Sequence, residues 1–124
     1  MIAQLKDRLF IVFALDHYNP LGVIRSLGEA GISPIFIAVQ HRFDIGVKSK
    51  YLSKCHKVRS VEEGYEVLIS QYGMYNGEER PFLFTSDDRT TGFLDERYDE
   101  IKDRFVFFNA GAKNRITEFM DKNT

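Results

Sequence analysis

An apolar strand, a helix and a second apolar strand follow one another near the N-terminus and constrain the fold most strongly. Residues 9–15 are apolar at every position, so both faces of the strand that they form must be covered. In the helix pattern that follows, Leu21, Ile24 and Leu27 share one face. The second apolar strand occupies residues 35–39. This order predicts a β-α-β unit with two parallel strands and a right-handed crossover.

The start of this helix is the first candidate binding site. Asn19 is expected to cap a helix whose first residue is Pro20, because proline has no N–H that needs a partner there. Gly31 supplies the predicted helix stop. The unpaired N–H groups of Leu21 and Gly22 then lie above the carboxyl end of the first strand, where α/β proteins hold anionic ligands.

The alternation of strands and helices continues along the rest of the chain. Further strands are predicted at 55–61, 81–85 and 105–108, and helices at 61–72 and 113–122. A polar stretch at 88–104 carries Leu94, Tyr98 and Ile101 at the spacing of a helix face, and its charged side chains are interpreted as solvated. The sequence therefore predicts an α/β fold: a three-layer Rossmann-like domain with a parallel sheet of about five strands and the first strand at its centre.

Composition excludes several classes of function. A chain of 124 residues with 44% hydrophobic and 28% charged residues forms one ordinary globular domain. A net charge of −1 gives no electrostatic reason to expect nucleic acid or an acidic membrane as a partner. No apolar run approaches the roughly 20 residues that span a bilayer, and no signal-peptide pattern is present. With Cys55 as the single cysteine, no internal disulfide is possible, and the expected compartment is the cytoplasm.

Common ligand motifs are missing from the sequence. The turn at 16–22 lacks the G-x-G-x-x-G pattern of a dinucleotide site, and no Gly-Lys-Ser/Thr of a P-loop is found. The three histidines are far apart and lack the spacing of metal ligands, so no metal site is predicted. Cys55 lies beside basic residues that lower a thiol pKa, but it is interpreted as a small side chain in a short strand.

Four short pieces of sequence, taken in order, resemble a known family. They are residues 19–27 with Gly31-Ile32 after them, Ser49-Lys50-Tyr51 ahead of Val58, Thr85-Ser86-Asp87 at the end of the fourth strand, and Asp121-Lys122. Their order resembles the N-terminal domain that precedes the ATP-binding module of ATP-grasp ligases, the group containing carbamoyl-phosphate synthase large subunits and D-aspartate ligases. The resemblance spans nearly the whole chain.

This resemblance implies that the functions of the enzyme are divided between this domain and an ATP-binding module. Residues 1–124 would form a single pre-ATP-grasp domain, and the ATP-grasp module expected after Thr124 is absent from them. ATP and Mg²⁺ would belong to the full-length enzyme, a carbon–nitrogen ligase that joins a carboxylate to an amine. This domain alone would bind no cofactor, contain no catalytic residue and show no activity. Its implied partners are the ATP-grasp module, in the same chain or a split subunit, a small carboxylate or amino acid substrate, and a second copy in a homodimer.

The expected substrate contacts gather at the carboxyl edge of the sheet. They are Asn19, Leu21, Gly22, Arg25, Ser86 and Asp87. Each polar member also has a purely structural interpretation. Asn19 is a helix cap, Arg25 is placed to pair with Glu29 at i,i+4, and Ser86 and Asp87 belong to a common helix-start signature.

Two alternative functions remain open. One is a stand-alone small-ligand-binding module of flavodoxin-like or receiver-like shape. A receiver would need paired acids after the first strand and a lysine after the fifth, whereas Asp16 stands alone and Lys113 lies five residues past the fifth strand. The other is a structural dimerisation domain.

Overall fold

The computed structural model describes residues 9–15, 18–39, 50–74 and 80–109, and its elements alternate between strand and helix. They are β1 (Phe10–Leu15), α2 (Tyr18–Glu29), β2 (Ile35–Val39), β3 (Lys54–Val58), α3 (Val61–Tyr72), β4 (Phe82–Thr85), α4 (Asp88–Glu96), α5 (Tyr98–Ile101) and β5 (Val106–Asn109). The helix predicted at 113–122 lies outside the described residues.

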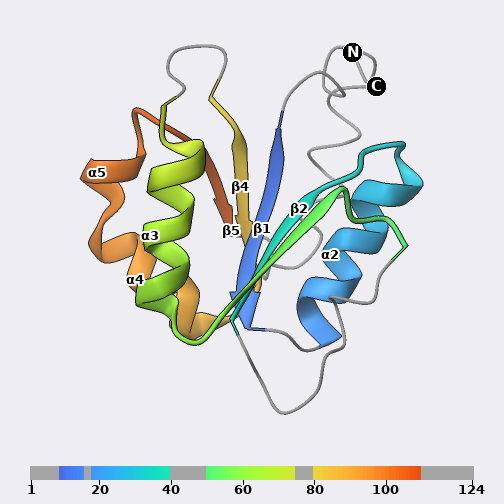
Figure 1. The fold of residues 1–124 in the computed structure, drawn as a ribbon, viewed down its shortest axis with the longest axis horizontal. Coiled ribbons are helices and arrows are strands. Elements are labelled where there is room, and N and C mark those ends of the chain that lie inside the picture. The colour runs from blue at the N-terminus through green and yellow to red at the C-terminus, as the bar shows by residue number, and fades with distance from the viewer. Residues whose placement is uncertain (1–8, 16–17, 40–49, 75–79, 110–124) are drawn as a thin grey trace.

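The five strands form one sheet in the order β3-β2-β1-β4-β5, and every neighbouring pair is parallel. Val12 at the middle of β1 is opposite Phe36 of β2 on one side and Phe84 of β4 on the other. The predicted parallel sheet with its first strand at the centre is therefore confirmed. The chain builds the sheet outward from β1 in one direction, returns, and then builds it outward in the other direction (Figure 1).

Helices cover both faces of the sheet and give the domain three layers. Figure 1 shows α2 on one face and α3, α4 and α5 on the other. Alternate residues of β1 divide between two cores: Phe10 and Val12 pack beneath α2, whereas Ile11 and Phe13 pack beneath α3 and α4. Because a parallel central strand has no solvent face, its unbroken apolar sequence follows directly from this position.

The start of α2 differs from the prediction. The helix begins at Tyr18, so Pro20 is its third residue and Asn19 is not its cap. The N–H groups of the first turn have no acceptor within a helix, so a proline is tolerated at any of these positions and does not mark the first residue. The predicted stop is confirmed. Gly31 has φ 87°, and the Ile32 N–H donates to the Leu27 carbonyl at 2.9 Å.

The third strand ends earlier than predicted, at Val58. Ser60 is instead the cap of α3, because its side chain accepts the N–H of Glu63 at 3.1 Å. Val61 therefore opens α3, which runs to Tyr72 and ends before Gly73 as the sequence predicts.

The polar stretch after β4 forms two helices, α4 and α5, instead of one continuous helix face. The break at Arg97 changes the helical phase between them. Leu94 and Ile101 are buried, whereas Tyr98, which the spacing places on the same helix face, is 50% exposed, so the three do not share one face.

Two glycines allow close packing of helices. A Cβ on Gly64 of α3 would lie 2.5 Å from a ring carbon of Phe13, so α3 approaches β1 at this point more closely than any side chain permits. A Cβ on Gly28 of α2 would collide with the ring of Tyr51. Tyr51 ends the Ser49-Lys50-Tyr51 piece of sequence, and it packs against the α2-side core.

Candidate functional site

The carboxyl edge of the sheet contains a topological switch point between β1 and β4. After β1 the chain crosses to one face as α2, and after β4 it crosses to the other face as α4 (Figure 1). Loops that leave adjacent parallel strands in opposite directions open a crevice between the strand ends, and α/β domains bind ligands there. Of the six predicted contact residues, four belong to the segments that border this crevice: Asn19, Leu21, Ser86 and Asp87.

Asp87 joins the two sides of the switch point. Its Oδ1 accepts the N–H of Leu15, the last residue of β1, at 3.0 Å. Its Oδ2 accepts the N–H of Thr90 at 2.8 Å and so caps α4. The structural interpretation of Asp87 as a helix start is confirmed, and its role in ligand contact stays a prediction. With both oxygens engaged by backbone donors, Asp87 fixes the geometry of the crevice.

Ser86 is the residue at this edge whose buried polar side chain has no evident structural role. It is 7% exposed, and its buried hydroxyl has no hydrogen-bond partner among the residues that the structure describes. The neighbouring Thr85 hydroxyl, by contrast, lies 2.7 Å from the hydroxyl of Thr91 in α4. Because side chains alternate along an extended chain and Phe84 packs with the α2-side core, we expect the side chain of Ser86, one residue past the end of β4, on the α2 face. A ligand with a polar group would satisfy this hydroxyl.

The donors offered by α2 are shifted from their predicted positions. In a helix that runs from Tyr18, the N–H of Gly22 is engaged by the carbonyl of Tyr18 in the i to i−4 pattern, whereas the acceptor position for Leu21 is residue 17, outside the described residues. The backbone N–H groups of Tyr18 and Asn19 have no i−4 acceptor within this helix, and Pro20 has no N–H to offer. An anion at this helix end would therefore contact the first two residues instead of Gly22.

Two of the predicted contact residues lie farther along α2. Gly22 is exposed, and a Cβ placed on it would have no neighbouring atom within 4 Å. Arg25 is exposed and lies seven residues beyond Tyr18, which is about 10 Å along the helix axis. The structure thus brings Ser86 and Asp87 together at the switch point and keeps the Arg25 backbone away from it.

A second polar cluster lies on the edge strand β3, away from the switch point. The Nε2 of His56 and the hydroxyl of Tyr72 in α3 share a hydrogen bond at 2.7 Å. Burial, with a smaller contribution from the positive charge of Lys54, lowers the pKa of His56 below its ordinary value of 6.5. β2 and β1 separate this histidine from β4, so it belongs to the α3 packing and not to the crevice.

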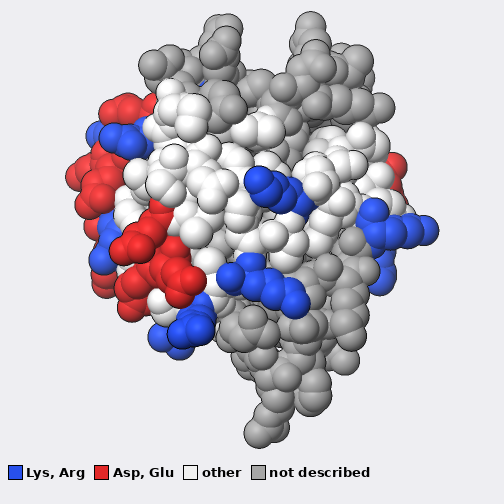
Figure 2. Space-filling view, in the orientation of Figure 1, with Lys and Arg blue, Asp and Glu red and all other residues white. Residues whose placement is uncertain are grey.

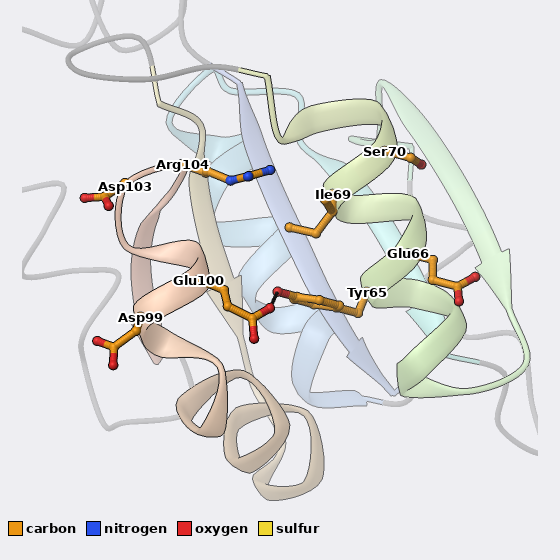
Figure 3. A pocket seen from close by; sticks show the side chains of 8 residues that line it. All are labelled: Tyr65, Glu66, Ile69, Ser70, Asp99, Glu100, Asp103 and Arg104. Carbon is orange, nitrogen blue, oxygen red and sulfur yellow. Dashed lines mark hydrogen bonds between the residues drawn. The ribbon is translucent and has the colours of Figure 1, made fainter.

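A surface hollow of about 800 Å³ lies between α3 and α5, and no local pattern in the sequence predicts it. Its lining residues are Tyr65, Glu66, Ile69 and Ser70 from α3, Asp99 and Glu100 from α5, and Asp103 and Arg104 after it. Figure 3 shows Tyr65, Ile69, Glu100 and Arg104 directed into this hollow from its two sides. The sequence predicts only a solvated face for Asp99, Glu100 and Asp103 and makes no prediction for Glu66, because nothing local in the sequence places α5 beside α3.

The described residues contain no group of three or more His, Cys, Asp or Glu side chains placed to hold a metal ion. None of the helices within 9–15, 18–39, 50–74 and 80–109 has the length and apolar character that crossing a membrane requires. Comparisons with models of protein families, with curated proteins and with solved structures gave no match.

Proposed function

We propose that this chain is the N-terminal, substrate-side domain of an ATP-dependent carboxylate–amine ligase of the ATP-grasp type. The order of the four sequence pieces supports the family. The crevice between β1 and β4 supports a substrate-side role, because it lies at the carboxyl ends of adjacent parallel strands. The buried, unpartnered hydroxyl of Ser86 is the single observation that carries the placement of the ligand there.

In this proposal the domain binds and orients a small acid. The first-turn N–H groups of Tyr18 and Asn19 and the hydroxyl of Ser86 supply donors to one carboxylate. The positive end of the α2 dipole stabilises the same negative charge. The carboxylate of Asp87 disfavours a second anionic group nearby and favours an amine or hydroxyl at that end of the substrate.

The chemistry of the ligase belongs to the ATP-grasp module, located in the same chain or in another subunit. There the γ-phosphoryl group of Mg-ATP passes to a carboxylate oxygen, which forms an acyl phosphate and ADP. An amine then attacks the carbonyl carbon and expels phosphate. The proposed domain supplies one wall of the pocket in which this happens and no catalytic group, and it acts in the cytoplasm.

Backbone amide shifts of the ¹⁵N-labelled chain test the proposed site. Small amino acids, dicarboxylates and bicarbonate are titrated separately, with Mg-ATP as a further arm. We expect shifts at Tyr18, Asn19 and 86–88 with the acids and none with Mg-ATP. Shifts confined to β3, or to the amino ends of the strands, would contradict the substrate-side assignment, and low-micromolar binding of Mg-ATP would contradict the absence of a nucleotide site.

A separate observation distinguishes the ligase from a stand-alone ligand-binding or dimerisation module. The reading frame that encodes Thr124, or an adjoining gene, is expected to encode a glycine-rich ATP-grasp module. A natural reading frame that ends with this domain, with no such gene beside it, would favour the stand-alone module even if the carboxyl edge binds acids.

A further inference from the structure

The hollow between α3 and α5 has the form of a groove with two helical walls. Tyr65 and Ile69 are one turn apart on α3 and point into it, and Glu100 and Arg104 point into it from the opposite side (Figure 3). α5 is a helix of only 4 residues, so it is too short to lie along the whole length of α3. Among the described residues, none covers the space beside the longer helix.

The floor of the groove is rigidly built around Tyr65. Its hydroxyl donates to Oε1 of Glu100 at 2.9 Å and connects the two walls. Its ring meets the ring of Phe93 edge to face, with the centroids 5.6 Å apart. The guanidinium of Arg97 lies 3.6 Å from the Phe93 centroid and 5.7 Å from the Tyr65 centroid. A tyrosine held in this way has little side-chain freedom left to lose when a partner binds.

The margins of the groove are acidic. Four carboxylates line it (Glu66, Asp99, Glu100 and Asp103) against one cation, Arg104. Asp99 is partly neutralised by Lys102 at 3.4 Å, whereas Glu66 on one margin and Asp103 on the other point away from the floor (Figure 3). Figure 2 shows most of the acidic side chains of this view gathered over α3, α4 and α5.

Two exposed apolar side chains lie close in sequence to the lining residues of the groove, although neither lines it. Among the described residues the large hydrophobic side chains that are exposed are Met74, at 68%, and Tyr98, at 50%. Met74 lies two residues beyond the end of α3, and Tyr98 is the first residue of α5. Exposed aromatic and methionine side chains are typical of protein-binding surfaces.

We infer that the α3–α5 groove is a docking surface for a basic amphipathic helix of a partner protein. The apolar side of such a helix contacts Tyr65 and Ile69 on the floor, and lysine or arginine side chains on its flanks reach Glu66 and Asp103. Two parallel acidic margins about an apolar floor match a helix with one apolar stripe and basic flanks. The occupant is identified by charge complementarity, since the margins exclude an acidic helix. This surface is independent of the crevice at β1 and β4.

A labelled model peptide tests the groove directly. The probe is a fluorescein-labelled peptide of about 14 residues, roughly four helical turns, with leucines at helical spacing and lysines elsewhere. The control peptide carries glutamate in place of every lysine. We expect the lysine peptide to bind the chain, to shift the amide resonances of 65–70 and 99–104, and to bind less tightly as salt is raised. The glutamate peptide is expected not to bind.

Two matched double variants distinguish the effect of the acidic residues in the groove from the effect of the protein's net charge. Glu66→Gln/Asp103→Asn removes one charge from each margin and is expected to weaken peptide binding about fivefold or more. Glu29→Gln/Asp95→Asn removes the same number of charges from exposed positions outside the groove and is expected to change binding by less than about twofold. All four positions are exposed, so both variants should fold, which circular dichroism verifies.

Equal weakening by the two double variants would overturn the inference, as would peptide-induced shifts that map elsewhere. Dilution-dependent shifts at 65–70 and 99–104 in the free chain would overturn it as well, because they would identify a second copy of the chain as the occupant.

Discussion

The carboxylate of Asp87 accepts the backbone N–H of Leu15 at 3.0 Å and so joins the ends of two adjacent strands across 72 residues of sequence. The same carboxylate caps α4 through the N–H of Thr90. One side chain therefore determines both where α4 starts and how far the ends of β1 and β4 lie apart. The width of the proposed binding crevice depends on this side chain.

Replacing Asp87 should destabilise the domain much more than replacing its neighbour. Asp87→Ala is expected to lower the free energy of unfolding by about 2–3 kcal/mol, because it removes a helix cap and leaves the part-buried Leu15 N–H without its acceptor. Asp88→Ala, at an exposed first-turn position, should cost less than about 1 kcal/mol. Urea unfolding of both variants gives the comparison. Equal losses of unfolding free energy in the two variants would show that the hydrogen bonds of the Asp87 side chain contribute little to stability.

Two glycines of the same helix should respond to alanine in opposite directions. Gly22→Ala places its methyl in open space and is expected to raise the free energy of unfolding by up to about 1 kcal/mol, because alanine is the better helix former. Gly28→Ala forces a methyl into the ring of Tyr51 and should lower it by about 1–3 kcal/mol. Thermal unfolding of the pair tests this. A stabilising Gly28→Ala would mean that the segment around Tyr51 moves aside easily.

His56 should make the domain less stable in mild acid. Its folded-state pKa lies below 6.5, so the unfolded chain takes up the proton first as the pH falls. The contribution of His56 to stability is therefore fully present above pH 6.5 and is lost as the pH falls from there toward the lower folded-state value. Urea unfolding at several pH values should show this loss, and His56→Gln should reduce it. An imidazole pKa at or above 6.5, measured by NMR, would contradict the prediction.

Tyr65 should lose its hydroxyl proton only at unusually high pH. Burial, followed by the hydrogen bond to Glu100 and the charge of that residue, raises its pKa from 10 to about 12, although Arg97 and Arg104 act in the opposite direction. The unfolded chain loses this proton first, so the stability contributed by Tyr65 should fall between pH 10 and 12. NMR titration of ¹³C-labelled tyrosine rings follows the ionisation directly. Glu100→Gln is expected to bring the pKa back toward 10, and Glu66→Gln to leave it in place.

Local patterns in the sequence were sufficient to predict the sheet. β1, β2 and β4 are covered on both faces, so each of them is an unbroken apolar run that needs no tertiary information to recognise. β3 is an edge strand with exposed Lys54 and Lys57, and its alternating sequence reflects that position. The helix ends at Gly31 and Gly73 were predictable because their signals are single residues in the chain.

The parts of the sites that depend on long-range contacts could not be predicted in this way. Asp87 was expected at the right edge, but its bond to Leu15 follows only from the placement of β4 beside β1. The unpartnered hydroxyl of Ser86 is likewise visible only once its surroundings are packed. The groove depends on Tyr65 meeting Glu100, which is 35 residues away in sequence. The start of α2 was misplaced because several first-turn positions accept proline equally well.

Ser86 offers the most direct test of the proposed binding crevice. A buried hydroxyl without a partner lowers stability, so Ser86→Ala should leave the free energy of unfolding unchanged or raise it by up to about 1 kcal/mol. Thr90→Val, which removes the other buried hydroxyl without a partner among the described residues, is the matched control. Thr90 lies within α4, on the opposite face of the sheet from α2.

The decisive measurement compares stability and ligand affinity in the same variants. Calorimetry with the small acid that binds the wild-type chain most tightly gives the affinity, and urea unfolding gives the stability. We predict that Ser86→Ala weakens binding about tenfold, the loss of one hydrogen bond to a charged group, with no loss of stability, whereas Thr90→Val leaves binding unchanged. Unchanged affinity in Ser86→Ala, or equal loss in both variants, would contradict a ligand site at the switch point.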